Sequence, residues 1–156
     1  MADGQHENDE LEFGAEEQLE LLRSNTLAMA YGTIAFLQEQ GIPSTAWVEA
    51  LGDIFARGWD AEEQWTPEDF LDATILNLAA FGGEAIQAEF GDDEATALIV
   101  YFPDPGRIAE LGLDDVDGDL LYELITPIAR VCGVRYRWQR DGEHVRIRIR
   151  PAAAAR

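Results

Sequence analysis

The amino-acid sequence predicts an α+β fold, in which N-terminal helices precede two helix–β-hairpin units. The four strands of these units form one antiparallel sheet with the helices packed on one face. Apolar residues recur every three or four positions over the early segments, which is the period of an amphipathic helix. Later segments alternate apolar and polar residues and end in turn sequences, as strands do. Because an isolated hairpin is only marginally stable, we expect the two hairpins to join.

The length of 156 residues suits a single domain, which we place at residues 15–151. Hydrophobic residues make up 47% of the chain and charged residues 27%, a balance that predicts a packed core. The polar, acidic residues 1–14 are expected to be a disordered tail, and residues 152–156 a frayed end. The one cysteine, Cys132, excludes an internal disulfide and a multi-cysteine metal site.

Three helices are predicted in the first half of the chain. The first spans residues 15–40 and stops at Gly41, which is followed by a proline two positions later. The second spans residues 45–57, where apolar side chains again recur with helical spacing. The third, residues 66–81, opens with the sequence Thr-Pro-Glu-Asp, which combines a capping threonine with a proline at the first helical position.

The first hairpin follows, with strands over residues 86–90 and 96–102. Residues 104–118 are expected to form a loop that contains one helical turn. A fourth helix spans residues 119–131, and Pro127 kinks or splits it.

The last hairpin has the clearest pattern, with alternating strands over residues 134–139 and 145–149. Asp141 and Gly142 are the preferred pair for a two-residue type I′ turn. This turn predicts that the aromatic and β-branched residues of both strands share one buried face, and that the arginines share the other.

The predicted register places Arg137 opposite Arg146 and Arg135 opposite Arg148. Like charges directly opposite each other destabilise a sheet, so a negative charge is expected across this face. Four explanations stay open. These are an acid of the same chain, such as Glu89 or the N-terminal tail, the acidic surface of a second subunit, an anionic ligand that suits the guanidinium fork, and screening by solvent.

Residues 68–103 and 119–151 share an order of helix, glycine, hairpin and proline. The spacing from glycine to proline is 20 positions in the first unit and 18 in the second. The pattern indicates either an internal duplication or the coincidence of two common units.

The net charge is −20, from 31 acidic and 11 basic residues, and all the basic residues are arginine. Residues 1–129 hold 29 acids and three arginines, whereas residues 130–156 hold two acids and eight arginines. We expect the basic end to fold back on the acidic body and not to bind nucleic acid, because that body would repel phosphates. The aromatics Tyr136 and Trp138 also face away from the arginines. The absence of lysine is typical either of a GC-rich genome or of a salt-rich cytoplasm.

No apolar run approaches the ~20 residues that span a bilayer, and the N-terminus does not resemble a signal peptide. The sequence therefore predicts a cytoplasmic protein without membrane insertion.

No conventional catalytic or metal-binding set stands out, and we expect neither a cofactor nor a metal. Cys132 follows a helix C-terminus, which disfavours a thiolate, so it is interpreted as a small buried hydrophobe. Residues 114–119 lack the ligands that a calcium loop needs at its ends and are interpreted as a helix N-cap region. Glu49 and Asp53 lie at i, i+4 and could do acid–base work, which keeps a carboxylate-dependent enzyme as a third hypothesis.

The large aromatic content suggests a binding function, through an apolar pocket between helices and sheet. The candidate ligand-binding residues are Tyr31, Trp47, Trp59, Tyr136 and Trp138, with Arg135 or Arg137 available to an anionic ligand. We therefore expect a non-enzymatic small-ligand-binding or regulatory module that forms a homodimer through its first helix and takes an apolar or amphipathic ligand. The alternative is a protein-binding adaptor without a ligand, whose acidic body meets a basic partner.

The order of elements over residues 15–151 resembles that of vinyl-reductase-type domains and of TRAPP-type trafficking subunits. Residues 120–131, which lead into 133–149, look most like these families. The resemblance implies a dimer with an apolar pocket and no catalysis of its own. The chain lacks the cysteines of the final vinyl-reductase-type hairpin and the acylated cysteine of the trafficking subunits, so no residue role is carried over.

Overall fold

A computed structural model describes residues 14–152, and the predicted tails lie almost wholly outside these residues. The helices are α1 (Ala15–Glu39), α2 (Ser44–Ala56), α3 (Pro67–Ala80), α4 (Pro105–Glu110), α5 (Asp115–Asp119), the 3₁₀ helix η1 (Leu120–Leu124) and α6 (Ile125–Val131). The strands are β1 (Glu84–Glu89), β2 (Ala95–Val100), β3 (Val134–Asp141) and β4 (His144–Pro151). The predicted α+β fold is confirmed.

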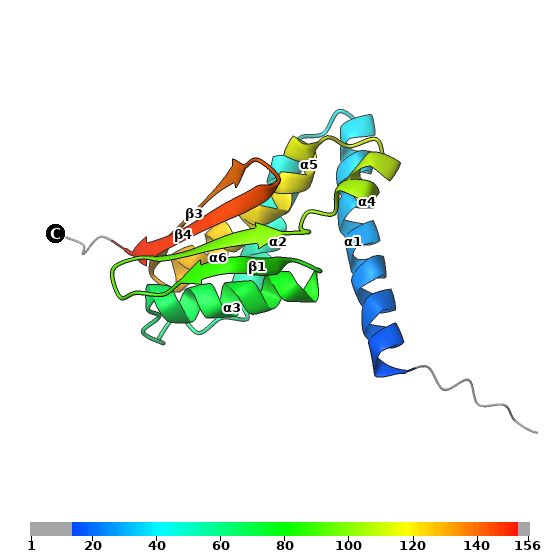
Figure 1. Cartoon of the computed structure of the whole chain (residues 1–156). Helices are drawn as coiled ribbons and strands as arrows, with labels where there is room; N and C mark the ends of the chain where they lie inside the picture. Colours follow the sequence, from blue (N-terminus) through cyan, green and yellow to red (C-terminus); the bar gives the residue numbers. More distant parts are fainter. Residues whose placement is uncertain (1–13, 153–156) are drawn as a thin grey trace, which may run out of the picture.

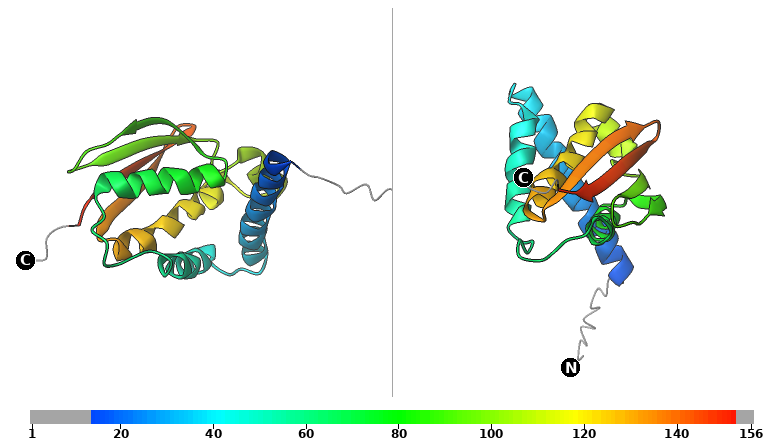
Figure 2. Two further views of the ribbon diagram at one scale, coloured as in Figure 1. Left: turned by 90° about the horizontal axis from the view of Figure 1, so that it is seen from below. Right: turned by 90° about the vertical axis from the view of Figure 1, so that its left-hand side faces the viewer.

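All four strands form one antiparallel sheet in the order β1-β2-β4-β3 (Figure 1). The two hairpins therefore join through β2 and β4. Helices α3 and α6 cover one face of this sheet, and α2 packs on the far side of α6 and η1 (Figure 2). Helix α1 stands at the end of this stack, where it contacts α2 and α4.

Local sequence signals account for the helix boundaries. Thr66 caps α3, because its Oγ1 accepts a hydrogen bond from the backbone N–H of Asp69 at 3.1 Å, as predicted. Asp114 likewise caps α5 and accepts from the N–H of Asp117 at 2.9 Å. The predicted loop 104–118 is more helical than expected, since it holds both α4 and most of α5.

The predicted fourth helix is split into the end of α5, the 3₁₀ helix η1 and α6. Pro127 has no N–H to donate to the carbonyl of Glu123, and its ring would clash with that carbonyl in a regular α-helix. The backbone therefore tightens into a 3₁₀ turn upstream of the proline.

The register of the last hairpin differs from the prediction by two residues. Asp141 pairs with His144, so that Gly142 and Glu143 form the turn. Gly142 has a φ of 63° and Glu143 does not have a positive φ, which is typical of a type II′ turn with glycine first. The predicted type I′ turn at 141–142 is therefore wrong, although the same residues still face the core.

The two edges of the sheet differ. The β1 edge is interrupted by a bulge between Ala85 and Gln87, which leaves Ile86 exposed. The β3 edge runs without interruption from Val134 to Asp141 and pairs with no other strand of the described residues.

Helix α2 packs closely on the segment around Pro127 through Gly52. A methyl group at Gly52 would lie 2.8 Å from Pro127 Cγ and 2.9 Å from the backbone oxygen of Leu124. Neither a proline ring nor a backbone carbonyl can move away easily. We therefore expect Gly52→Ala to lower the free energy of unfolding by about 1–3 kcal/mol, as measured by urea denaturation.

Gly32→Ala is the matched control, because a methyl group at this position in α1 would meet nothing within 4 Å. Alanine favours a helix over glycine, so a gain of about 0.5–1 kcal/mol is expected. Equal losses at both glycines would contradict the close contact between α2 and α6.

Within residues 14–152, no helix is long and apolar enough to cross a membrane.

Candidate functional site

An apolar groove lies between α1 on one side and α2, α3 and α6 on the other. Its volume is about 680 Å³. Six aromatic side chains line it: Trp47, Phe55, Trp59, Phe70, Phe81 and Phe102. No charged side chain of the described part of the chain lies along it. The groove is thus an apolar concave surface in a chain whose net charge is −20.

Polar contacts position α1 and leave the groove open. Arg23 donates from Nε to the oxygen of Ala80 at 3.2 Å and from NH2 to the oxygen of Ala79 at 3.1 Å, so that it caps α3. Arg107 donates to the backbone oxygen of Ser24 at 3.2 Å. Arg23 thus connects α1 to α3, and Arg107 connects α4 to α1. The backbone of α1 stands apart from α3 and α6 (Figure 2).

An aromatic cluster forms one end of the groove. The ring centroids of Trp59 and Trp65 are 5.1 Å apart, and Phe70 lies 5.6 Å from Trp59 and 6.3 Å from Trp65. Trp65 donates from its indole N–H to the backbone oxygen of Asp60 at 3.1 Å, which fixes the ring. The cluster therefore packs as one unit, and Trp59 is its accessible ring in the lining of the groove.

Two polar side chains of the groove donate hydrogen bonds to backbone oxygens of their own helices. Thr33 donates from Oγ1 to the oxygen of Met29 at 2.7 Å. Asn77 donates from Nδ2 to the oxygen of Ala73 at 2.8 Å. A charged group at the bottom of this groove would therefore find no charged partner and would lose its hydration.

The structure brings two of the predicted ligand-binding residues, Trp47 and Trp59, to the groove. Tyr31 of α1 is fully buried and does not line the groove, and its hydroxyl accepts from the N–H of Asp104 at 3.3 Å. Burial raises the pKa of Tyr31 above its usual value, and the negative charge of Asp104 adds to this shift.

Tyr136 and Trp138 do not line the groove either. Both lie on the inner face of β3, where Trp138 stacks on Tyr122 at 5.4 Å and donates its indole N–H to Glu123 Oε1 at 2.8 Å. The predicted pocket between sheet and helices is therefore filled by these rings. Sequence reasoning missed Phe70, Phe81 and Phe102 as groove residues, although the helical spacing around Phe70 signalled an apolar face.

The hydroxyls of Tyr122 and Tyr136 differ in their hydrogen bonding. Tyr122 donates to the backbone oxygen of Phe102 at 2.7 Å, whereas the buried hydroxyl of Tyr136 has no hydrogen-bond partner among the described residues. Burial raises the pKa of both groups well above their usual range. Both tyrosines therefore stay neutral.

We expect Tyr136→Phe to leave the free energy of unfolding unchanged or to raise it by up to about 1 kcal/mol, because it removes an unpaired buried hydroxyl. Tyr122→Phe should lower it by about 1 kcal/mol, because the oxygen of Phe102 then loses its donor. Chemical denaturation of the two variants checks both values. A loss at Tyr136 as large as that at Tyr122 would show that the hydroxyl holds a bound water.

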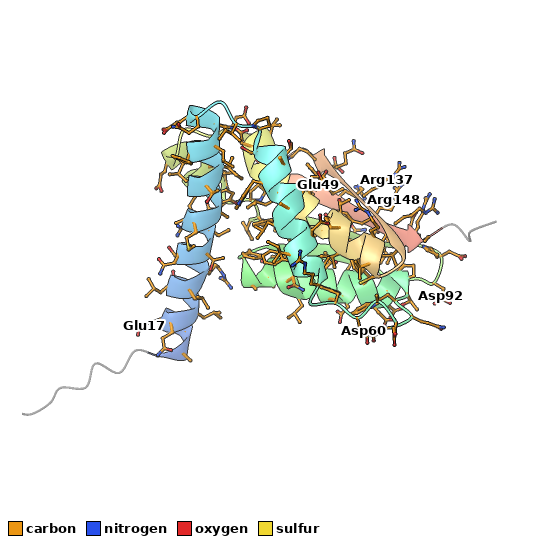
Figure 3. The ribbon with its side chains drawn as sticks, turned by 180° about the vertical axis from the view of Figure 1, so that it is seen from behind. Glu17, Glu49, Asp60, Asp92, Arg137 and Arg148 are labelled. Carbon is orange, nitrogen blue, oxygen red and sulfur yellow. The ribbon has the colours of Figure 1, made fainter. Side chains whose placement is uncertain are left out.

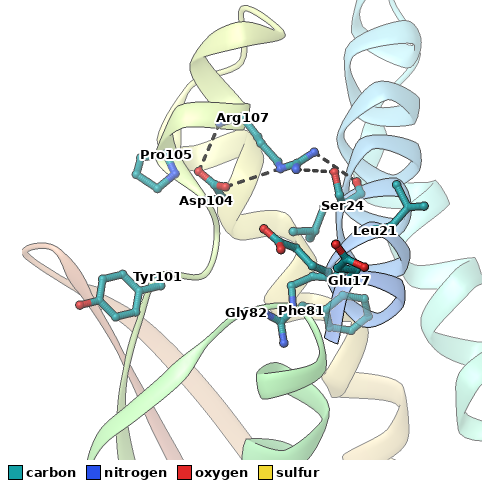
Figure 4. Close-up of a pocket in the computed structure, with 12 residues that line it drawn as sticks. Glu17, Leu21, Ser24, Phe81, Gly82, Tyr101, Asp104, Pro105 and Arg107 are labelled. Carbon is teal, nitrogen blue, oxygen red and sulfur yellow. Dashed lines mark hydrogen bonds and ion pairs between the residues drawn. The ribbon is translucent and has the colours of Figure 1, made fainter. Parts of the chain in front are cut away.

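A second cavity, of about 660 Å³, adjoins the groove along α1 and shares Leu27 and Phe81 with it (Figure 4). Its lining mixes apolar and polar side chains, and the charged ones include Glu17, Glu20, Arg23 and Arg107. Both arginines are already engaged, Arg23 with α3 and Arg107 with Ser24. The cavity therefore offers no free cation to an anionic ligand, and its exposed carboxylates are those of an acidic surface.

Five arginines of β3 and β4 point away from the helices, and we call them the arginine face: Arg135, Arg137, Arg146, Arg148 and Arg150. The observed register pairs Arg135 with Arg150 and Arg137 with Arg148, so arginine still lies opposite arginine (Figure 3). This face is across the sheet from the groove, and Arg135 and Arg137 therefore cannot contact a ligand within it.

Acids of the same chain neutralise part of the arginine face. Glu94, which lies just before β2, contacts Arg148 at 3.7 Å and also pairs with Arg150. Asp141 pairs with Arg146 at 2.8 Å. The neutralising acid is thus Glu94 and not Glu89 as expected, while the predicted role of the N-terminal tail falls outside the described residues.

The remaining candidate groups, Cys132, Glu49 and Asp53, lie outside the linings of both cavities. Cys132 is buried after α6, and burial together with the charge of Glu63 raises the pKa of its thiol to about 11. Glu49 and Asp53 are exposed on α2 and line neither cavity. Among residues 14–152, no group of three His, Cys, Asp or Glu side chains could hold a metal ion.

The fold and the groove define an α+β chain with a helical side that carries an open apolar surface. The sequence matches no protein-family model and no curated protein. The groove is therefore interpreted from its own chemistry.

Proposed function

We propose that the chain is a non-enzymatic module that binds a small apolar or amphipathic ligand in the groove and works as a homodimer. One observation carries the proposal: an open groove of about 680 Å³ with aromatic walls, along which residues 14–152 place no charged side chain. This volume is typical of small-molecule sites, which measure roughly 300–1,000 Å³. The resemblance in element order to vinyl-reductase-type domains is part of the same proposal.

The polarity of the lining supports an apolar or amphipathic ligand. The apolar part would lie against Trp47, Phe55 and Trp59, whose ring faces need no hydrogen-bond partner. A charged head group would stay at the mouth, in water, because the groove offers it no charged partner. The ligand therefore belongs to the class of hydrocarbon or aromatic compounds with at most one polar end.

Native mass spectrometry in volatile salt, compared with the denatured mass, tests the proposal directly. Extra mass that disappears on denaturation would support it and would report the ligand class. Binding of the amphipathic dye 1-anilinonaphthalene-8-sulfonate provides a second readout. Ala30→Trp, which places an indole in the groove, should weaken dye binding by about tenfold or more.

Ala50→Trp is the matched control, because Ala50 is exposed on α2 and does not line the groove. It should leave dye binding unchanged. A bare chain mass together with equal dye binding by both variants would overturn the proposal. That outcome, with salt-sensitive binding of a basic protein, would favour the adaptor function instead.

A further inference from the structure

Helix α1 exposes large apolar side chains along most of its length. Leu22 is 64% exposed, Met29 74% and Phe36 57%. Only Leu27, Tyr31 and Ile34 of its 25 residues are buried hydrophobics. A helix with so much apolar surface in water is typical of one that packs against a further element.

Four of the exposed apolar residues, together with two partly buried threonines, follow the spacing of a coiled coil. The positions alternate by three and four residues, and we call them the α1 seam: Leu19, Leu22, Thr26, Met29, Thr33 and Phe36. Such spacing keeps one stripe of a helix against a neighbouring helix. Thr26, Met29 and Thr33 of the seam also line the groove. A helix that packs on the seam therefore lies across the open side of the groove.

The four inner positions of the seam are complementary in size about a centre between Thr26 and Met29. In an antiparallel pair of α1 helices, Met29 lies opposite the partner's Thr26, and Leu22 lies opposite the partner's Thr33, so that a large side chain meets a small one. At the two ends of the seam, Leu19 and the partner's Phe36 are both large and extend the apolar contact. A two-fold axis generates both halves of such an interface from one surface. No partner of different sequence is needed to explain the pattern.

We propose that α1 pairs antiparallel with α1 of a second copy along the α1 seam, and that the partner's helix closes the groove. The site is incomplete without the partner, since Met29 is 74% exposed at the rim of the groove in a single copy. In this dimer the partner's α1 covers the open side of the proposed ligand site. This part of the inference rests on the proposed function.

Electrostatics gives this dimer a distinctive salt dependence. Each copy carries a net charge of −20, so two copies repel each other at low ionic strength. Salt screens this repulsion and leaves the apolar contact intact. The affinity of the dimer should therefore increase as the salt concentration rises. The affinity of an acidic surface for a basic protein would instead decrease with salt.

Light scattering after size exclusion tests the pairing, with an expected mass twice the 17.3 kDa of the chain. Met29→Glu should weaken dimerisation by about a hundredfold or more, because each interface would bury a carboxylate against apolar side chains. Leu76→Glu is the matched control, because Leu76 is 73% exposed on α3 and lies outside the seam. Circular dichroism checks that both variants remain folded. A monomeric wild-type chain, or equal dimerisation by both variants, would overturn the inference.

Cysteine cross-linking tests the orientation, in a Cys132→Ser background. The double variant Leu22→Cys and Thr33→Cys should cross-link two copies on mild oxidation, because these positions face each other in the antiparallel pair. Leu22→Cys alone should not, since the two cysteines would then lie about 16 Å apart along the helices. Cross-linking by the single variant would show a parallel pair and would overturn the register.

The outcomes separate this inference from the proposed function. A monomer that still binds the dye in the groove would overturn the pairing and leave ligand binding intact. A dimer with the expected cross-links that binds no ligand would support the pairing and overturn the ligand function.

Discussion

Arg140→Met is expected to lower the free energy of unfolding by about 3 kcal/mol, as measured by urea denaturation. Arg140 lies at the end of β3 on the inner face, where it donates from Nε to Asp119 Oδ2 at 3.0 Å and from NH2 to Oδ1. Asp119 is only 6% exposed, so the variant leaves a buried carboxylate without its cation. Water reaches part of the Arg140 guanidinium, and the expected loss is therefore at the lower end of the range for buried pairs.

The double variant Asp119→Leu and Arg140→Met provides the control. Because both charges are gone, it should recover most of the loss and come within about 1 kcal/mol of the wild type. If Arg140→Met alone lowered the free energy of unfolding by less than about 1 kcal/mol, the ion pair would not stabilise the contact between β3 and the helices. The pKa of Arg140 is raised, chiefly by its hydrogen bond to Asp119, so the guanidinium stays charged at every ordinary alkaline pH.

Phe70→Ala is expected to cost about 3–5 kcal/mol of unfolding free energy, which places it with the largest core truncations. Phe70 is completely buried, and its ring packs against both Trp59 and Trp65. Removing it leaves a void that these rigid indoles cannot fill. Thermal or urea denaturation measures the loss, and a shift of tryptophan fluorescence reports the change around the two indoles.

Phe90→Ala is the matched control, because Phe90 is about half exposed. Its truncation should cost no more than about 1 kcal/mol. Since Phe70 also lines the groove, its loss should enlarge the groove and, under the proposed function, favour bulkier ligands over small ones. Equal costs at the two phenylalanines would contradict the assignment of the aromatic cluster to the core.

The sequence predicted the elements well wherever one local signal decided the backbone. The Thr-Pro-Glu-Asp sequence at Thr66 fixes the start of α3, and alternation fixes which side chains of β3 and β4 face the core. The hairpin register was wrong because Gly142 suits either position of a two-residue turn. The pairing of β3 with β4, and not the turn sequence, decides which of the two turn positions Gly142 occupies.

The groove could not be predicted in the same way, because it depends on where α1 lies. That placement is set by contacts between residues far apart in the chain, Arg23 with the end of α3 and Arg107 with Ser24. Tyr136 and Trp138 were expected in a pocket because alternation places them inward. Alternation does not tell which helix covers them, and Tyr122 and Glu123 occupy that space.

The free edge of β3 has a consequence for how copies of this chain can grow into larger assemblies. An uninterrupted edge strand offers its backbone to any other strand, and fibrils extend in this way. Arg135 and Arg137 stand along this edge, so an approaching β3 would bring its own arginines against them. At the opposite edge, the bulge at Ile86 breaks the backbone pattern that an added strand would need. Both features disfavour the addition of a further strand to the sheet.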